Sequence, residues 1–353
     1  MKSSCKNIYF IFLALLSFSV ICAQNNRNSV IKGTVYDKET GEALSGASVY
    51  FNGTTLGTIV LKNGSYMLEV NKAGNYELII SMIGFEVEKR KIFVKQGSVN
   101  NYNFKLVPKP VNIKTVEVEG DDQKEWKRSL DIFRRKFLGS LDPAYHCEIE
   151  NKEFLNFKWT HDTLNAYSDK PIIVKNNYIG YLISFQIKKF SYSPMTSEQE
   201  FLYTSFFREL KPEDQSQMEN WKKNREEIFY GSPVHFLWAL RNGRLFTEKY
   251  KLYFTSDPKQ ATYDILKEVV NTETLLNAEQ LTEDPTYSFG EYMKVVYKNR
   301  DESFIQRRGA FFSIDKNGIA DNHLPFLCMG YWANLGAACL LPLDYLPESL
   351  KKD

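Results

Sequence analysis

The sequence contains few of the residues that usually carry out reactions. Its 353 residues include five cysteines and four histidines, which are His146, His161, His235 and His323. No histidine begins an HExxH or HxxE zinc pattern, and the chain has no CxxC, no GxSxG, no P-loop and no GxGxxG fingerprint. The recognisable motifs of zinc peptidases, serine hydrolases and nucleotide-binding proteins are therefore missing. We predict no catalytic residue, no metal ligand and no cofactor.

The chain also lacks an excess of charge of one sign. It has 45 lysines and arginines against 43 aspartates and glutamates, and no long run of either sign. A nucleic-acid-binding protein usually shows a basic stripe, so we predict no nucleic-acid partner. The densest basic patch consists of Lys127, Arg128, Arg134, Arg135 and Lys136, which we interpret as the solvated face of a helix.

Long apolar runs are rare, and the clearest extends from Ile8 to Ile21. Lys2 and Lys6 flank its start, and Ala23 precedes a polar stretch. This arrangement predicts a signal peptide over residues 1–23, and the run is too short for a membrane-spanning helix. We expect an exported protein, periplasmic or associated with the outer membrane, with no transmembrane segment after cleavage. An uncleaved anchor and lipid attachment at Cys22 are alternatives, the second disfavoured by the bulky Ile21.

Three cysteines remain after the predicted leader: Cys147, Cys328 and Cys339. An odd number does not form a complete disulfide framework. Cys328 and Cys339 could form a disulfide in an oxidising compartment. Their apolar surroundings favour buried free thiols instead.

Short alternating strands characterise residues 29–107. Apolar residues recur at every second position in several segments, and Asn52-Gly53 and Asn63-Gly64 supply tight turns between them. Period-two alternation at this spacing predicts an antiparallel β-sandwich. Residues 108–120 contain Pro108 and Pro110 and then a strand-like segment at 115–118. We interpret them as a linker that ends in an edge strand.

Residues 121–353 predict a second, α+β domain. Trp126, Leu130, Phe133 and Phe137 share one helical face, and Gly139 is placed to end that helix. A helix is also expected over 213–230, and a short one from Ser232-Pro233 to Asn242-Gly243. Strands are expected at 154–160, 172–175, 179–192, 201–207, 249–255, 292–297 and 304–314. The apolar segment from residue 329 to 341 is interpreted as a closing segment docked on this domain.

A few residues were weighed as candidates for chemistry. His146, Cys147 and Glu148 are adjacent, but neighbours on a strand point to opposite faces, so a surface or packed histidine is favoured. Ser232 is better explained as a helix start than as a nucleophile. Residues 315–318, Asp-Lys-Asn-Gly, lack the acids of a calcium loop and favour a turn. A Cys–His pair or a pair of carboxylates would depend on the fold, and the sequence leaves both open.

The motif string Gly33–Asp37, Thr40–Glu42, Gly46–Val49 and Ile83–Phe85, together with Asn63-Gly64, resembles the carboxypeptidase regulatory-like domain. The resemblance implies a transthyretin-like sandwich of about seven strands, common at the front of Gram-negative envelope proteins. One departure is that Val60-Leu61 stands where the family usually has Thr-Asp. The C-terminal part is similar to exported proteins that share this front domain and have no established activity. The resemblance carries over no catalytic residue.

Three functions remain open. The favoured hypothesis is a non-catalytic cell-envelope protein, in which the sandwich is a structural or interaction module for the C-terminal domain. Its partner would be another envelope protein, bound by strand addition at 115–118, or a glycan or peptide. The second is an exported hydrolase of peptide or glycan with an unrecognised site in residues 121–353. The third is a glycan-binding module, which predicts exposed Trp or Tyr rings in one plane.

Overall fold

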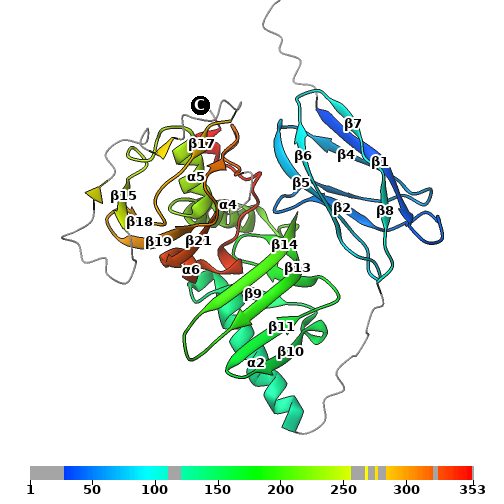
Figure 1. The fold of residues 1–353 in the computed structure, drawn as a ribbon, viewed down its shortest axis with the longest axis horizontal. Coiled ribbons are helices and arrows are strands. Elements are labelled where there is room, and N and C mark those ends of the chain that lie inside the picture. Colours follow the sequence, from blue (N-terminus) through cyan, green and yellow to red (C-terminus); the bar gives the residue numbers. More distant parts are fainter. Residues whose placement is uncertain are drawn as a thin grey trace, which may run out of the picture.

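The computed structural model describes residues 28–109, 121–255, 267–268, 275–276, 284–320 and 325–351. It consists mainly of strands, with a small number of helices (Figure 1). The predicted mainly-β, α+β fold class is therefore confirmed. The predicted signal peptide, the strand-like segment 115–118 and His323 lie outside the described residues.

The first part of the chain folds into two sheets packed face to face, which we call the sandwich (Figure 1). One sheet contains β1 (Ser29–Asp37), β4 (Ser65–Val70), β7 (Val99–Asn101) and β8 (Phe104–Leu106). The other has the order β3-β2-β5-β6, from β2 (Ser48–Phe51), β3 (Gly57–Ile59), β5 (Gly74–Ser81) and β6 (Glu88–Val94). Alternate residues such as Ile31, Val35, Phe51 and Leu78 are buried between the sheets. The period-two pattern therefore marks the inward-facing side chains.

The sandwich has eight strands because its last segment is divided. β7 and β8 both run parallel to β1, and Tyr102 and Asn103 lie between them. The side-chain oxygen of Asn103 accepts a hydrogen bond from the Thr34 backbone N–H at 3.0 Å. A side chain thus takes the place of the backbone at this point of the ladder, and the strand is interrupted there.

The C-terminal region begins with α2 (Asp121–Leu138), which ends at Gly139 as predicted. The rings of Phe133 and Phe137 contact Phe190 and Phe185 of the adjacent sheet. This sheet contains β9 (Cys147–Ile149), β10 (Asn156–Thr160), β11 (Thr163–Tyr167), β12 (Ile172–Asn176), β13 (Tyr181–Tyr192) and β14 (Gln199–Glu209). The short helix α3 (Asp142–Tyr145) connects α2 to β9, and η1 (Lys152–Phe154) connects β9 to β10.

Two further helices lead into a second sheet. They are α4 (Gln215–Phe229) and α5 (Pro233–Arg241), both predicted. The sheet has the order β16-β15-β18-β19-β21 and contains β15 (Tyr250–Thr255), β16 (Lys267–Glu268), β18 (Tyr292–Tyr297), β19 (Asp301–Arg307) and β21 (Phe326–Gly330). A small pair is formed by β17 (Thr286–Tyr287) and β20 (Phe312–Ser313). The single strand expected over 304–314 was wrong, because the chain leaves the ladder after Arg307 and re-pairs as β20.

The closing segment contains α6 (Tyr331–Leu335) and η4 (Ala337–Cys339), and η5 (Glu348–Leu350) follows it. Trp332 is buried in the C-terminal core, where its Nε1–H donates to the carbonyl of Gly231 at 2.7 Å. The segment then continues to Leu343 and Asp344, which contact the sandwich. Docking on the C-terminal region was predicted, and the second contact with the sandwich was missed.

Candidate functional site

The turn between β2 and β3 joins the sandwich to the edge of β14. The Gly53 N–H donates to the carbonyl of Ser205 at 2.7 Å, and the Phe207 N–H donates to the carbonyl of Thr54 at 3.0 Å. The side-chain oxygen of Asn52 accepts from the Ser205 N–H at 2.9 Å. Gly53 has φ +73°, which favours glycine, so the Asn-Gly turn predicted from sequence also presents its backbone to the neighbouring sheet.

Leu343 and Asp344, which follow the closing segment, contact the same turn from another side. The Leu343 N–H donates to the carbonyl of Gly53 at 2.7 Å. The carboxylate of Asp344 accepts from the backbone N–H of Thr55 at 3.0 Å and from its hydroxyl at 2.5 Å. The turn is therefore fixed between β14 and the C-terminal end of the chain.

A second contact is made by the turn at residues 315–318. Asp315 accepts hydrogen bonds from the backbone N–H groups of Asn317 and Ile319 at 2.8 and 2.9 Å, which closes the turn. Asn317 then donates its amide N–H to the carbonyl of Ala73 at 2.8 Å, at the start of β5. Burial raises the pKa of the Asp315 carboxyl, although these hydrogen bonds partly oppose the shift. The segment is a turn, as predicted, and its role in joining the sandwich to the rest was not predicted.

The interface between these contacts is apolar. Tyr50 and Ile79 lie on the outer face of the second sandwich sheet, and both are buried. The ring of Tyr50 packs at 5.1 Å from that of Phe206, and its hydroxyl lies 3.5 Å from the Thr204 hydroxyl. An isolated sandwich would expose these side chains to water. The run Leu78, Ile79, Ile80 breaks the period-two alternation, and this signal could have predicted a covered outer face.

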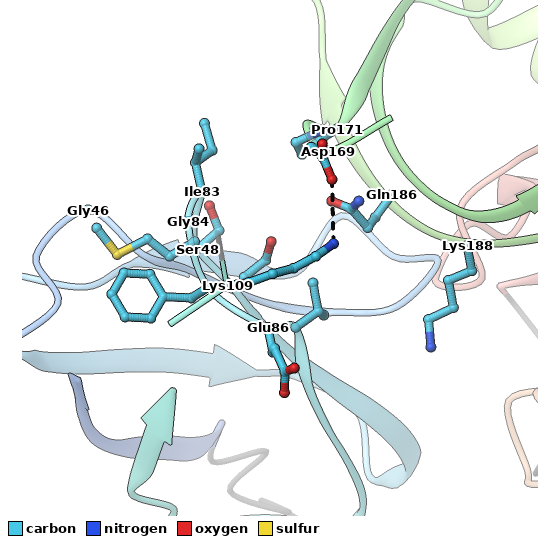
Figure 2. A pocket seen from close by; sticks show the side chains of 14 residues that line it. Gly46, Ser48, Ile83, Gly84, Glu86, Lys109, Asp169, Pro171, Gln186 and Lys188 are labelled. Atoms are coloured by element: carbon cyan, nitrogen blue, oxygen red, sulfur yellow. Dashed lines mark hydrogen bonds and ion pairs between the residues drawn. The ribbon is translucent and has the colours of Figure 1, made fainter. Parts of the chain in front are cut away.

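A cavity of about 570 Å³ lies beside this interface, and we call it the groove. The sandwich contributes the loop after β5 and the serines of β2 and β5, while the C-terminal region contributes Asp169, Pro171 and two residues of β13. Figure 2 shows Lys109 reaching from the sandwich side to Asp169, with Gln186 beside them. The Lys109 ammonium donates to Asp169 at 3.4 Å across the groove. The volume of the groove is within the range of small-ligand pockets.

One lysine lines the groove, and another lines a second cavity. Lys188 of β13 lines the groove, and Lys89 of β6 lines a cavity of about 450 Å³. The Lys188 side chain lies near enough to Lys89 to act on its charge. Partial burial, followed by the contact with Lys188, lowers the pKa of Lys89 to about 8, and the charge of Glu77 acts in the opposite direction. Two like-charged side chains thus meet where the sandwich faces the C-terminal region.

Among the described histidines, His235 makes the most contacts. Its Nδ1 accepts from the Gly231 N–H at 3.1 Å and lies 3.0 Å from the Tyr250 hydroxyl, and its Nε2 lies 3.3 Å from Glu248. A backbone donor at Nδ1 favours the neutral ring, and burial lowers the pKa of His235 to about 3. Histidine–carboxylate contact in a cleft would have favoured a hydrolase. The ring is fully buried and lines neither of the two cavities described above.

The other residues considered as candidates for chemistry do not form a common site. His146 is exposed and lies 3.6 Å from Asp142, whereas Cys147 is buried and points inward from β9. Ser232 caps α5 by accepting from the His235 N–H at 3.2 Å, as predicted. Within the described residues, no group of three or more His, Cys, Asp or Glu side chains could hold a metal ion.

The three cysteines Cys147, Cys328 and Cys339 are free, so the alternative disulfide is not formed. Burial raises the pKa of each thiol to about 12. The five tryptophans all lie within the described residues, and none is exposed. The exposed tyrosines Tyr145 and Tyr167 come from α3 and β11, so the aromatic plane of a glycan platform is not seen in this part of the chain.

Comparison with known proteins identifies the first part of the chain. Residues 31–118 match the family model of the CarboxypepD_reg-like domain. The sandwich is therefore a carboxypeptidase regulatory-like domain, as its motifs predicted. The match extends past residue 107 into the predicted linker and includes the segment 115–118. No protein of curated function matches the sequence.

Several solved structures match parts of the chain at low identity and low TM-score. A type II cohesin–X-dockerin complex from Acetivibrio cellulolyticus is 14% identical over 29% of this chain and 73% of its own, with a TM-score of 0.20. A candidate carbohydrate-binding protein from Bacteroides uniformis is 13% identical over 52% and 80%, with a TM-score of 0.20. A DUF3823 family protein from Parabacteroides merdae is 12% identical over 51% and 81%, with a TM-score of 0.18. At these scores we draw no functional argument from them.

Proposed function

We propose that this chain is a non-catalytic cell-envelope binding protein. In this proposal residues 29–107 and 121–353 act as two domains, and the sandwich braces the C-terminal domain. The groove between them receives a peptide or glycan. The observation that carries the proposal is the backbone pairing of the Gly53–Thr54 turn with β14, because it builds the groove from both domains at once.

The docking contacts support a fixed rather than a tethered arrangement. They combine backbone hydrogen bonds at Gly53 and Thr54 with the buried side chains of Tyr50 and Ile79. A buried apolar side chain contributes about 1.5–3 kcal/mol, and hydrogen bonds inside a protein contribute about 1 kcal/mol each. Several such contacts together favour one relative position of the two domains. A ligand in the groove would therefore meet preformed walls.

The groove's side chains suit binding better than catalysis. Asp169 is held by Lys109, and the serines Ser48 and Ser81 have no histidine among the residues that line the groove with them. Gln186 adds an amide that can donate and accept. A small number of polar groups around an apolar wall is typical of a site that orients a ligand.

Export is part of the proposal. The leader pattern over residues 1–23 supports it, and so does the family of the sandwich. Within the described residues, no helix has both the length and the hydrophobicity to cross a bilayer. We propose a location in the periplasm or at the outer membrane.

The proposal is tested by a substitution that fills the groove, followed by measurement of ligand binding and ligand cleavage. Gln186→Trp places an indole in the groove, and Lys251→Trp, on the exposed side of β15, is the matched control. Both proteins and the wild type are probed with arrays of envelope glycans and peptides, after thermal melting has shown that each is folded. We expect binding that Gln186→Trp abolishes and Lys251→Trp retains, with the ligands recovered intact. Binding that survives Gln186→Trp, or cleavage of the bound material, would contradict the proposal.

A further inference from the structure

The strand β6 forms one edge of the second sandwich sheet. Within the part of the chain that the structure describes, β6 pairs with β5 and with no other strand. Along such an edge, every second residue directs its N–H and C=O away from the sheet. β6 has seven residues, whereas β3, at the opposite edge of the same sheet, has three. Of these two edges, β6 therefore offers the longer row of backbone groups to a further strand.

The chain covers this side of the sheet only up to the start of β6. The Glu86 N–H donates to the carbonyl of Val107 at 2.8 Å, and the Lys109 N–H donates to the carbonyl of Gly84 at 2.7 Å. This short ladder does not continue into β6. Among the described residues, the edge is therefore open along the whole of β6.

The sequence of β6 combines three consecutive cations with an exposed aromatic ring. The cations are Lys89, Arg90 and Lys91, and Glu88 is the one acid of the strand. The side chain of Phe93 is 51% exposed, although the strand belongs to the sandwich. A ring on an edge strand can pack against a cross-strand neighbour, and three cations favour a neighbour that carries acids.

The charge of Arg90 is held at this edge. Its guanidinium lies 4.7 Å from the ring centroid of Phe104 and 5.7 Å from that of Tyr102. A guanidinium stacked on aromatic rings keeps its charge and its N–H donors. Arg90 is also exposed, so its charge acts on whatever lies beside β6.

The cavity of about 450 Å³ lies over the same strand. Lys89, Lys91 and Phe93 line it, and these alternate residues share one face of β6. Tyr203 of β14 and Ala320 line it from the C-terminal region. A strand added beside β6 would direct every second side chain to the same face. The cavity therefore provides room for side chains of such a strand, and side-chain pockets give strand addition its specificity.

We infer that β6 binds an extended acidic segment of another protein by strand addition. The backbone of the segment pairs with the open edge, and its acidic side chains lie near Lys89, Arg90 and Lys91. Its apolar side chains contact Phe93. This edge goes beyond the proposed binding function and does not depend on the groove, because neither Lys89 nor Phe93 lines the groove.

Other occupants fit this edge less well. A second copy of this chain would place its own residues 89–91 close to the same three cations, and cations on an edge strand oppose such self-pairing. A saccharide has no row of backbone N–H and C=O groups to match the edge. An acidic polypeptide supplies both the backbone groups and the complementary charge.

Isothermal titration of the intact protein with defined peptides tests the inference. The main probe is an acetylated hexapeptide amide of alternating Glu and Val. A second probe carries Lys in place of each Glu, and a third keeps the sequence but has every backbone amide N-methylated. We expect the acidic peptide to bind, and both other peptides to bind about 10-fold more weakly or worse.

Three variants locate the bound peptide. Lys91→Glu reverses a charge on β6 and should weaken binding of the acidic peptide by about 10-fold. Lys32→Glu, at an exposed position of β1 in the other sandwich sheet, is the matched control and should leave binding unchanged. Gln186→Trp, which fills the groove, should also leave it unchanged. Melting curves establish that each variant is folded.

Each other result would overturn the inference. Equal binding of the N-methylated peptide would mean that charge alone holds the probe, without strand pairing. Loss of binding in Gln186→Trp would place the peptide in the groove instead. A dimer in analytical ultracentrifugation that the acidic peptide dissociates would assign the edge to a second copy. Absence of binding by the acidic peptide would contradict the inference and leave the groove to its own experiment.

Discussion

Thr55 and Asp344 are 289 positions apart in the sequence and are joined by two hydrogen bonds. The carboxylate of Asp344 accepts from the Thr55 backbone N–H and from its hydroxyl, one through each oxygen. The last segment of the chain thereby closes over the sandwich after it has completed the C-terminal core. The docking of the sandwich on the rest of the chain consequently depends on the side chain of Asp344 as well as on strand pairing.

Removing this carboxylate should weaken the docking. Asp344→Ala leaves two partly buried donors of Thr55 without their acceptor, and we expect the free energy of unfolding to fall by about 1–3 kcal/mol. Thr55→Val removes only the hydroxyl, so a double-mutant cycle in denaturant should give a coupling energy of about 0.5 kcal/mol or more. Glu125→Ala, at an exposed position of α2, is the control and should change stability little. Additive effects at Thr55 and Asp344 would be inconsistent with the observed contact.

His235 should make the protein sensitive to acid. Its pKa is about 3 in the folded protein and near 6.5 when unfolded, so the unfolded chain binds the extra proton first. Stability is complete above pH 6.5 and falls as the pH decreases from 6.5 toward 3, by about 1.4 kcal/mol per pH unit from this residue. His235→Gln should be less stable at pH 8 and show a shallower fall. The exposed His146→Gln should keep the wild-type slope in urea titrations, and an unchanged slope in His235→Gln would refute the assignment.

Gly336 occupies a conformation that other residues rarely adopt. Its φ is 62° and its ψ is −172°, and an added Cβ would lie 2.3 Å from the backbone of Leu138 and Gly139. Gly336→Ala should therefore cost about 3 kcal/mol or more, since neither backbone can move without shifting α2. Gly290→Ala has open space around its Cβ and should be nearly neutral. Calorimetric melting temperatures distinguish the two, and equal melting temperatures would show that the close approach is absent.

The lysine pair should reduce stability at neutral pH. The pKa of Lys89 is about 8 when folded and near 10.5 when unfolded, so the penalty is full below pH 8 and disappears as the pH rises toward 10.5. Lys188→Gln removes the like charge and should stabilise the protein at pH 7, by about 1 kcal/mol after allowance for solvent screening. The gain should vanish near pH 10.5. A destabilised Lys188→Gln at pH 7 would contradict the like-charge contact.

Local signals predicted much of the fold. Both ends of α5 were predicted closely from the cap and stop residues Ser232, Pro233 and Gly243. The apolar spacing from Trp126 to Phe137 predicted α2. These signals act within a few residues along the chain. The strand β11, with only Leu164 and Ala166 buried, was missed because its pattern is too short to stand out.

The candidate site was not predictable in the same way. Lys89 and Lys188 are separated by 99 positions, and nothing local to either shows that they meet. One sequence signal of the interface is Ile79, an apolar residue at a position of β5 that should face outward. It indicates that the outer face of the sheet is covered, but not which segment covers it. Only the fold shows that β14 covers it, because pairing between distant strands depends on the whole topology.

The central claim is that the sandwich and the C-terminal region are docked through the Gly53–Thr54 turn. Residue-resolved amide hydrogen exchange tests it directly at three donors that cross the interface: Gly53, Phe207 and Leu343. We predict that their amides exchange as slowly as those inside β13, because opening them requires the domains to separate. Exchange at the rate of unpaired amides, with β13 still protected, would show that the domains are not docked in this way.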